Sequence, residues 1–330
     1  MTISADPGDS KLAIVADVGR RAVRLGLTDH RGRLRPETIR VYDPTEQPTI
    51  SGALTRFGKD CGLEQLPTRC AIAVAGIASG DTISITNSRW FLSRSGLAAM
   101  LKAPPLILND FAAIAWALGA ADSGGRFEAM GGTALVPAGP GTRCLIGVGS
   151  GLGVAVVAED VDHHVTVLPT EAGHCHFMDG LPELGPVLLR LRKTKTSLVA
   201  EDLISERGLL AIYQAVVAID ATTPRATDVQ GVIQLIASGR DATASKAADL
   251  FSRALWYFAG NMALVYGAWD GLMLTGSVAV ALRGAIRQAD AAGCFVMSGP
   301  YQRQLRALPR AMVTLDHAEL HGAARALLLR

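Results

Sequence analysis

A tight glycine turn between two apolar, strand-like runs occurs twice in this chain, at residues 17–24 and 147–153. Gly19 lies in the first turn and Gly149-Ser150-Gly151 forms the second, and such turns between β-forming runs are typical of β-hairpins. The flanking runs are Lys11–Asp17, Ala22–Thr28, Arg143–Val148 and Leu152–Val157. One related hairpin in each half predicts two lobes, with a boundary near Asp110.

The hydrophobic pattern around the hairpins alternates between strand-like and helix-like segments. Further strands are predicted at Glu37–Tyr42, Arg69–Ala75, Asp81–Thr86 (as an edge strand), Pro105–Leu108, Gly271–Thr275 and Ala311–Leu315. Helices are predicted at Thr49–Cys61, Ser93–Leu101, Phe111–Ala121, Leu181–Arg192, Val199–Ser205, Leu209–Ala218, Val229–Ala237, Asp241–Trp269, Val278–Ala289 and Glu319–Leu329. This order indicates an α/β protein with mixed sheets flanked by helices.

Composition excludes several classes of protein. Apolar residues make up 49% of the 330 residues and charged ones 19%, against about 25% charged in an average chain, so a large core is expected. The formal charge is only +2, with basic and acidic residues scattered, which argues against a nucleic-acid partner. Polar residues divide the apolar stretch Ala254–Leu282, which argues against a membrane span. The N-terminus, Met1–Lys11, shows no signal peptide, so a cytoplasmic protein is expected.

Two glycine-containing segments are candidates for binding an anion. Gly147–Gly153 holds four glycines in seven residues, which lets backbone approach a ligand closely, although it lacks the spacing of the dinucleotide fingerprint. Its amides either cradle a phosphate or form a packing turn. Asp17 ends the first strand and is either a plain turn former or a group that faces an anion or a hydrated metal.

Two polar pairs are candidates for acid–base or sugar-binding chemistry. Asn109-Asp110 follows an apolar strand and precedes a helix, so it is either a helix cap or a carboxylate able to take a proton from a hydroxyl. Glu171 and His174 flank small residues in a loop, where they either grip neighbouring sugar hydroxyls or are simply solvated. A metal at His174-Cys175-His176 is disfavoured because no fourth ligand is in view.

Together, seven short stretches resemble the bacterial glucokinase family of the hexokinase and actin-like superfamily, over nearly the whole chain. They are LAIVADVG (12–19), AIAVAG (71–76), ITNSRWFLS (85–93), LILNDFAAIAWAL (106–118), IGVGSGLGVAVV (146–157), LPTEAGH (168–174) and FAGNMAL (258–264). The zinc-binding cysteine cluster of the related repressor and sugar-kinase group is missing, which indicates the other glucokinase branch.

The resemblance implies a two-lobed actin-like (ribonuclease H-like) ATPase fold with glucose in a cleft between the lobes. It implies a small lobe over 1–110, completed by the C-terminal helix 318–330, and a large lobe over 111–317. The implied reaction transfers the γ-phosphoryl group of ATP to the 6-hydroxyl of glucose with Mg²⁺ present. A homodimer is common in the family, but the sequence leaves the oligomeric state, the hexose and the nucleotide preference open.

The same resemblance assigns residues by motif. Asp110 is the implied general base, and the implied sugar ligands are Asn87, Asn109, Asp110, Glu171, His174 and Glu201. In the Glu171–His174 loop, Ala172 replaces one glycine of the family's Glu-Gly-Gly-His. The implied nucleotide-binding residues are Asp17, Gly19, Arg20, Arg21, Gly149, Ser150, Gly151, Gly276 and Ser277. Asp17 would also hold Mg²⁺, through water.

One departure from the family's pattern concerns the first hairpin. The family has Asp-x-Gly-Gly-Thr-x-x-Arg, whereas this chain has Arg20-Arg21 in place of the Gly-Thr pair. The two guanidinium groups either neutralise phosphate charge or fill the ATP site. A catalytically weak or inactive sugar-binding regulator, or a kinase for another hexose, therefore stays as the alternative to an active glucokinase.

Overall fold

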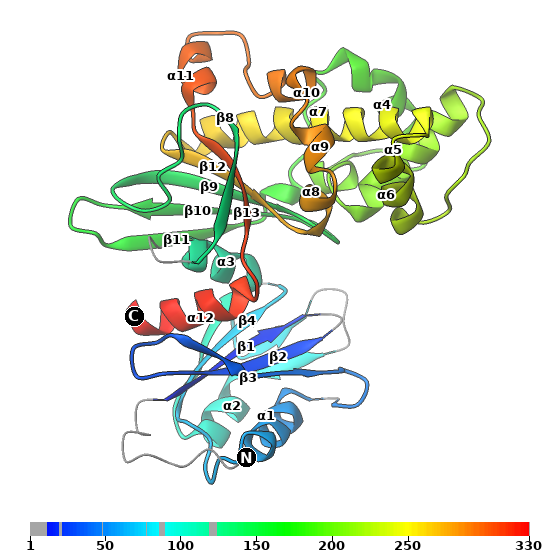
Figure 1. The fold of residues 1–330 in the computed structure, drawn as a ribbon. Coiled ribbons are helices and arrows are strands. Elements are labelled where there is room, and N and C mark those ends of the chain that lie inside the picture. Colours follow the sequence, from blue (N-terminus) through cyan, green and yellow to red (C-terminus); the bar gives the residue numbers. More distant parts are fainter. Residues whose placement is uncertain are drawn as a thin grey trace. The chain divides into compact units, whose positions relative to one another are not determined.

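The computed structural model describes residues 12–19, 22–47, 49–76, 78–85, 90–118 and 124–329 (Figure 1). The chain divides into two compact units, here called unit 1 (Met1–Ser123 with Leu315–Arg330) and unit 2 (Gly124–Thr314). The division lies beyond the boundary predicted at Asp110. The physical reason is that helix α3 (Asp110–Leu118) packs closely on helix α12 (Ala318–Leu329): a Cβ on Gly322 would lie 1.6 Å from the Ala113 carbonyl oxygen.

Unit 1 is built on a five-stranded mixed sheet in the order β3-β2-β1-β4-β7. Its strands are β1 (Ala13–Val18), β2 (Val23–Thr28), β3 (Leu34–Tyr42), β4 (Arg69–Val74) and β7 (Leu106–Asn109). The strands β1, β2 and β3 are antiparallel neighbours, whereas β1, β4 and β7 run parallel.

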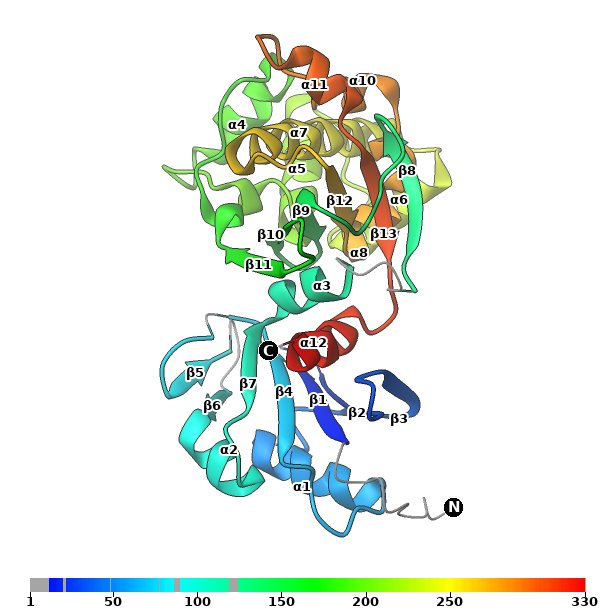
Figure 2. The ribbon, with the colours of Figure 1, turned by 90° about the vertical axis from the view of Figure 1, so that its left-hand side faces the viewer.

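Helices cover both faces of this sheet (Figure 2). On one face, Ile14 and Val18 pack in a core with α1 (Ile50–Asp60) and α2 (Arg94–Leu101). On the other face, Val15 packs with Leu320 of α12. Alternate residues of one strand therefore serve two cores, which explains why β1 is apolar except for Asp17.

Unit 2 is built on a six-stranded mixed sheet in the order β11-β10-β9-β12-β13-β8. Its strands are β8 (Arg126–Gly131), β9 (Gly141–Val148), β10 (Leu152–Glu159), β11 (Val165–Thr170), β12 (Gly271–Thr275) and β13 (Arg310–Thr314). Its helices are α4 (Gly185–Leu191), α5 (Glu206–Ile219), α6 (Val229–Ser238), α7 (Ala242–Tyr266), α8 (Ser277–Ala281), α9 (Arg283–Ile286), α10 (Ala289–Gly293) and α11 (Gln302–Ala307). The long helix α7 supplies large buried side chains such as Trp256 and Phe251 to the core.

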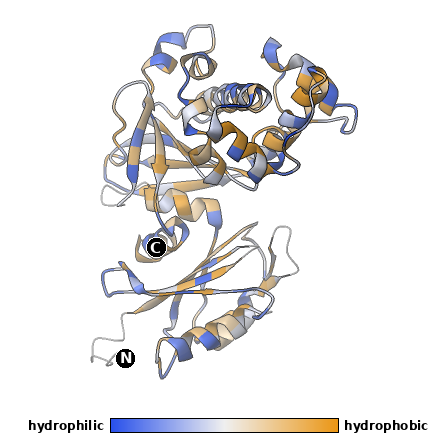
Figure 3. Cartoon of the chain, turned by 45° about the vertical axis from the view of Figure 1, so that its right-hand side comes forward, coloured by the Kyte–Doolittle hydropathy of each residue, from blue (hydrophilic) through white to orange (hydrophobic). Residues whose placement is uncertain are grey.

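The two sheets share one plan. In each, a three-stranded antiparallel meander is followed by two strands parallel to the first strand of its hairpin: β3-β2-β1-β4-β7 in unit 1 and β11-β10-β9-β12-β13 in unit 2. Figure 3 shows apolar residues along the strands of both sheets. The structure therefore confirms the α/β class, the mixed sheets and the two hairpins predicted at the glycine turns.

Several predicted elements differ in the structure. The run predicted as an edge strand forms β5 (Thr82–Ser84), which pairs only with β6 (Phe91–Ser93) in a separate two-stranded sheet. The helix predicted over Val278–Ala289 is broken into α8, α9 and the start of α10, and Leu282 leaves the helical conformation at the first break. The segment predicted as a helix over Val199–Ser205 is a single 3₁₀ turn, because Ser205 instead caps α5.

The strands β8 and β11 were not predicted. Both are edge strands of unit 2 with several exposed residues, and β8 carries Arg126 and Glu128 while β11 contains Pro169. Charges and proline suit an edge, where one side of the strand needs no partner. Among the helices of the described ranges, none has both the length and the apolarity to cross a bilayer.

Candidate active site

In unit 1, the parallel strands end at one edge of the sheet. Val18 of β1 pairs with Val74 of β4, which pairs with Asn109 of β7, so the segments that follow these three strands leave the sheet side by side. In open α/β sheets, ligands bind beyond the carboxyl ends of the parallel strands. This edge therefore places the Gly19 turn, Gly76 and Asp110 where a ligand is expected.

Asn109 and Asp110 lie where β7 passes into α3. Asn109 Oδ1 accepts from the Ala112 amide nitrogen (3.0 Å), and its Nδ2 donates to the Gly76 carbonyl oxygen (3.1 Å). The half-buried Asp110 begins the helix, and its Oδ1 accepts from the Phe111 amide nitrogen (2.8 Å). The capping interpretation thus holds for Asn109, and Asp110 has its carboxylate at the positive end of the α3 dipole.

Asp17 is buried below the first hairpin turn, with 4% of the residue exposed. Its Oδ2 accepts from Arg24 Nη1 at 2.6 Å. Burial, followed by repulsion from Glu319 and a smaller effect of Asp110, raises the pKa of Asp17 to about 7 against the opposing effect of Arg24. Arg24 and Glu319, which the sequence analysis did not single out, are thus part of the electrostatics of this edge.

Three of the predicted residues, Arg20, Arg21 and Asn87, lie outside the described residues. In the described part of the same turn, the Gly19 amide nitrogen donates to the Ala22 carbonyl oxygen (3.1 Å). Gly19 does not have a positive φ, and a Cβ there would lie 3.4 Å from the same oxygen. Position 19 therefore does not require a backbone conformation that only glycine adopts.

In unit 2, two turns lie together at the ends of β9 and β12. The β9–β10 turn is closed by a hydrogen bond from the Gly149 amide nitrogen to the Gly151 carbonyl oxygen (3.0 Å). Gly276 follows β12 with φ +98°, and a Cβ on it would lie 2.3 Å from the Val148 carbonyl oxygen. A Cβ on Gly149 would lie 3.5 Å from Ser277 Oγ. The structure thus brings the predicted nucleotide-binding residues of unit 2 together.

The Glu171–His174 loop packs against the same hairpin. A Cβ on Gly173 would lie 2.1 Å from the Leu152 carbonyl oxygen, so this glycine permits the loop's close approach. Ala172 and Gly173 are buried, whereas the Glu171 and His174 side chains are 59% and 57% exposed. His174 Nε2 lies 3.9 Å from Glu171 Oε2. The two predicted sugar ligands therefore lie side by side with their polar ends accessible in this unit.

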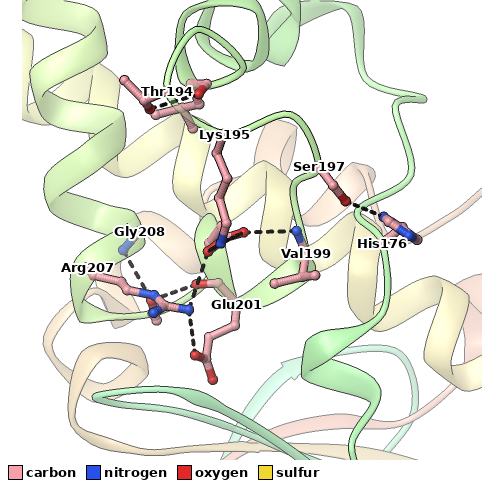
Figure 4. Close-up of polar contacts among 11 residues, drawn as sticks. His176, Thr194, Lys195, Ser197, Val199, Glu201, Arg207 and Gly208 are labelled. Carbon is pink, nitrogen blue, oxygen red and sulfur yellow. Dashed lines mark hydrogen bonds and ion pairs between the residues drawn. The ribbon is translucent and has the colours of Figure 1, made fainter.

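Glu201 is held near this loop by the backbone. It lies in the 3₁₀ turn Ala200–Asp202, and the Ala200 amide nitrogen donates to the Cys175 carbonyl oxygen (2.9 Å). Glu201 Oε2 accepts from the Leu152 amide nitrogen (3.0 Å). Figure 4 shows the second bond, in which Oε1 accepts from Arg207 Nη2 (2.8 Å). Arg207 was not predicted, since an arginine in the first turn of a helix gives no motif to find it by.

One group of potential metal ligands was also not predicted. Among the described residues, Asp160, Asp162 and His164 are the three side chains whose ligand atoms come close together, and all are exposed in the loop after β10. His174, Cys175 and His176 do not form such a group in that part of the chain.

Comparison with known proteins identifies the family. The glucokinase family model matches residues 14–329. The chain is 32% identical over 323 residues to the glucokinase of Stenotrophomonas maltophilia (strain R551-3), covering 96% of this chain and 94% of that protein. It is 32% identical over 321 residues to the glucokinase of Xanthomonas campestris pv. campestris (strain B100), with the same coverage.

Solved structures show the same fold. A glucokinase from an Antarctic psychrotroph superposes with a TM-score of 0.83 at 24% identity, covering 96% of this chain and 98% of that one. A ROK family glucokinase from Streptomyces griseus, solved with glucose and AMPPNP, gives a TM-score of 0.61 at 16% identity, covering 95% and 98%. The fold is therefore that of the actin-like sugar kinases, and the chain belongs to the glucokinase family.

Proposed function

We propose that this chain transfers the γ-phosphoryl group of ATP to the 6-hydroxyl of glucose, with Asp110 as the general base. The observation that carries the proposal is the family match over residues 14–329, which spans every described site residue of both units. Asp110 supports it, because its carboxylate lies at the start of α3, at the carboxyl edge of the sheet. A carboxylate at such an edge can accept a hydroxyl proton.

The sugar side of the proposal rests on Glu171, His174 and Glu201 of unit 2. Each offers hydrogen-bonding groups beside the β9–β10 hairpin, and Glu171 with His174 presents them to solvent. We assign Asn109 and Asn87 to further sugar hydroxyls from unit 1. A sugar that lacks a hydroxyl would leave these groups unpaired, which gives discrimination between sugars.

The nucleotide side rests on backbone turns in unit 2. The Gly149-Ser150-Gly151 turn lies beside Gly276 and the Ser277 hydroxyl, and phosphoryl transfer mainly requires positioning and charge neutralisation. In unit 1, we assign Asp17 and the Gly19–Arg21 turn to the phosphates. A cytoplasmic location would suit a protein that uses ATP.

Asp17 can hold Mg²⁺ best through water. Mg²⁺ prefers oxygen ligands and keeps much of its hydration shell. Arg24 occupies Asp17 Oδ2 at 2.6 Å, and burial raises the pKa of this carboxyl, both of which oppose a direct bond to the metal. When bound with ATP, Mg²⁺ would neutralise phosphate charge.

The Arg20-Arg21 pair favours a second candidate, a weakly active or inactive sugar-binding regulator. It removes a glycine and a hydroxyl from the turn assigned to the phosphates. The variant Arg20→Gly/Arg21→Thr restores the family's pair. Higher turnover in this variant would show that the arginines obstruct ATP, and a raised KM for ATP would show that they bind it.

A coupled assay with glucose and Mg-ATP, run beside calorimetric glucose binding, separates the two functions. The proposal predicts both binding and turnover. Binding without turnover in the wild-type chain would favour the regulator, and turnover with another hexose alone would replace glucose as the substrate.

A further inference from the structure

The two oxygens of the Glu201 carboxylate have different partners within unit 2. Oε2 accepts from the Leu152 amide nitrogen of the β9–β10 turn (3.0 Å), whereas Oε1 accepts from Arg207 Nη2 (2.8 Å). The Glu201 side chain is 15% exposed. A Cβ on Gly151 would lie 2.6 Å from Oε2, so the carboxylate is packed directly on the turn. Glu201 thus links the turn assigned to the nucleotide with the residues assigned to the sugar.

Arg207 belongs to a network of four charged side chains. It also lies 3.3 Å from Asp202 Oδ1, and Asp202 is held by Lys195 Nζ at 2.7 Å and by the Val199 amide nitrogen at 3.0 Å (Figure 4). Two cations and two carboxylates balance in charge. Because Lys195 and the Val199 amide hold Asp202 in place, Asp202 in turn restricts the position of the Arg207 guanidinium.

The position of Arg207 in the helix is locally unfavourable. Arg207 is in the first turn of α5, whose N-cap Ser205 accepts from the Gly208 amide nitrogen (3.1 Å). A cation at a helix N-terminus opposes the helix dipole. Residues that break a local rule without a local gain are commonly functional, and here the gain is the bond to Glu201.

We propose that Arg207 is a positioning residue that holds Glu201 against the β9–β10 turn, and that the Glu201 carboxylate thereby couples sugar binding to nucleotide binding. The inference rests on the proposed function, because it takes Glu201 as a sugar ligand and the turn as a phosphate site. A sugar hydroxyl would donate to the Glu201 carboxylate, and a phosphate would bind the Gly151–Leu152 backbone on which this carboxylate packs. The carboxylate would therefore link the two ligands. Each ligand would then favour the carboxylate position that the other requires.

The experiment measures how far one ligand changes the affinity for the other. Calorimetry gives the glucose Kd with and without saturating AMPPNP and Mg²⁺, and the ratio of the two values is the coupling factor. We expect a wild-type factor of about 5 to 100, the common range for coupled sites. Arg207→Ala should bring it close to one, and Arg207→Lys, which keeps the charge, should restore part of it.

Arg225→Ala is the matched control. Arg225 Nη1 lies 3.3 Å from Asp241 Oδ2, and the two side chains are 63% and 7% exposed, so the pair resembles Arg207 with Glu201. Asp241 caps α7 through the Ala244 amide nitrogen (2.8 Å) and is not assigned to either substrate. The control should keep the wild-type coupling factor, and thermal unfolding of all variants checks that they are folded.

The outcomes separate this inference from the function on which it rests. If the wild-type chain neither binds nor phosphorylates glucose, the proposed function fails. If it does both, but shows a coupling factor near one, or the same factor in Arg207→Ala as in the wild type, the coupling role is overturned. A reduced factor in Arg225→Ala as well would also overturn it, because the effect would then be a general result of losing an ion pair.

Discussion

The hairpins of the two units have the same strand plan but different residues beside the turn. In β1–β2 the pair next to the turn, Val18 with Val23, is followed by Asp17 opposite Arg24. In β9–β10, Val148 with Leu152 is followed by Gly147 opposite Gly153. The second pair from the turn is therefore an ion pair between buried Asp17 and half-buried Arg24 in unit 1, and two glycines in unit 2.

The two turns also differ in how closely neighbouring groups pack on their glycines. In unit 2, Gly149 and Gly151 are fixed by neighbours: the Glu206 amide nitrogen donates to the Gly149 carbonyl oxygen (2.8 Å), and Glu201 packs on Gly151. In unit 1, Gly19 has room for a Cβ. One strand plan thus supplies charge in one unit and closely packed backbone in the other.

The largest expected effect comes from removing the proposed base in unit 1. Asp110→Asn should lower kcat by about 10²–10⁴, because general base catalysis contributes that much. Glucose affinity should stay within about tenfold, since the amide retains hydrogen-bonding capacity. The coupled assay and calorimetry measure the two quantities, and near-normal turnover would remove Asp110 from the mechanism.

A pair of alanine substitutions tests the difference between the turns. Gly276→Ala should destabilise the protein by about 3 kcal/mol, because its φ of +98° and the nearby Val148 carbonyl oxygen leave no place for a Cβ. Gly19→Ala should change stability by only about 0.5 kcal/mol. Chemical denaturation measures both, and equal losses would show that the turns are not packed differently.

The sugar side of unit 2 is tested by Glu171→Ala and His174→Ala. Each should weaken glucose binding by about 1–3 kcal/mol, the usual result of leaving buried polar partners unpaired in a complex. Nucleotide affinity, measured by titration with AMPPNP, should change little. Unchanged glucose affinity in both variants would return this loop to a solvated surface feature.

The buried carboxyl of unit 1 predicts a dependence of stability on pH. Because folding raises the pKa of Asp17 to about 7, the folded chain holds a proton that the unfolded chain has lost between about pH 4 and 7. Its contribution to stability is therefore present at low pH and falls as the pH rises through this range, by at most about 1.4 kcal/mol per pH unit. Asp17→Asn should lack this slope.

The measurement is the free energy of unfolding of both proteins from pH 4 to 8. Subtracting one profile from the other removes the titrations that they share. Parallel profiles would show that folding does not raise the pKa of Asp17, and that this carboxyl contributes no pH dependence to the free energy of unfolding.

The central elements of the fold could be predicted from the sequence, but its edges could not. Runs such as those of β1, β4 and β9 are largely buried on both faces and therefore mostly apolar, with Asp17, Arg69 and Arg143 as their charged residues. The half-exposed edge strand β8, with its charged residues, has no comparable pattern. The pattern of α8 to α10 reads as one helix because periodicity does not show where a chain must bend to pack.

The candidate site also has a part that could be predicted from the sequence and a part that could not. Glu171, His174 and Glu201 belong to short contiguous motifs, so they were predicted. The repulsion of Asp17 by Glu319 and the hydrogen bond from Leu152 to Glu201 join segments far apart in the chain, and they became visible only in the structure. The ion pairs that set the charges and positions of site residues were missed for this reason.

The central claim, that the charged hairpin of unit 1 and the backbone turns of unit 2 serve one phosphoryl transfer to glucose, is tested most directly by the products. Purified chain is incubated with glucose and Mg-ATP, and phosphorus NMR follows ADP and the sugar phosphate. The account predicts one ADP for each glucose 6-phosphate, with the phosphorus on O6 and product formation by Asp110→Asn slower by about 10²–10⁴. ADP without sugar phosphate, or no product from a chain that binds both ligands, would contradict it.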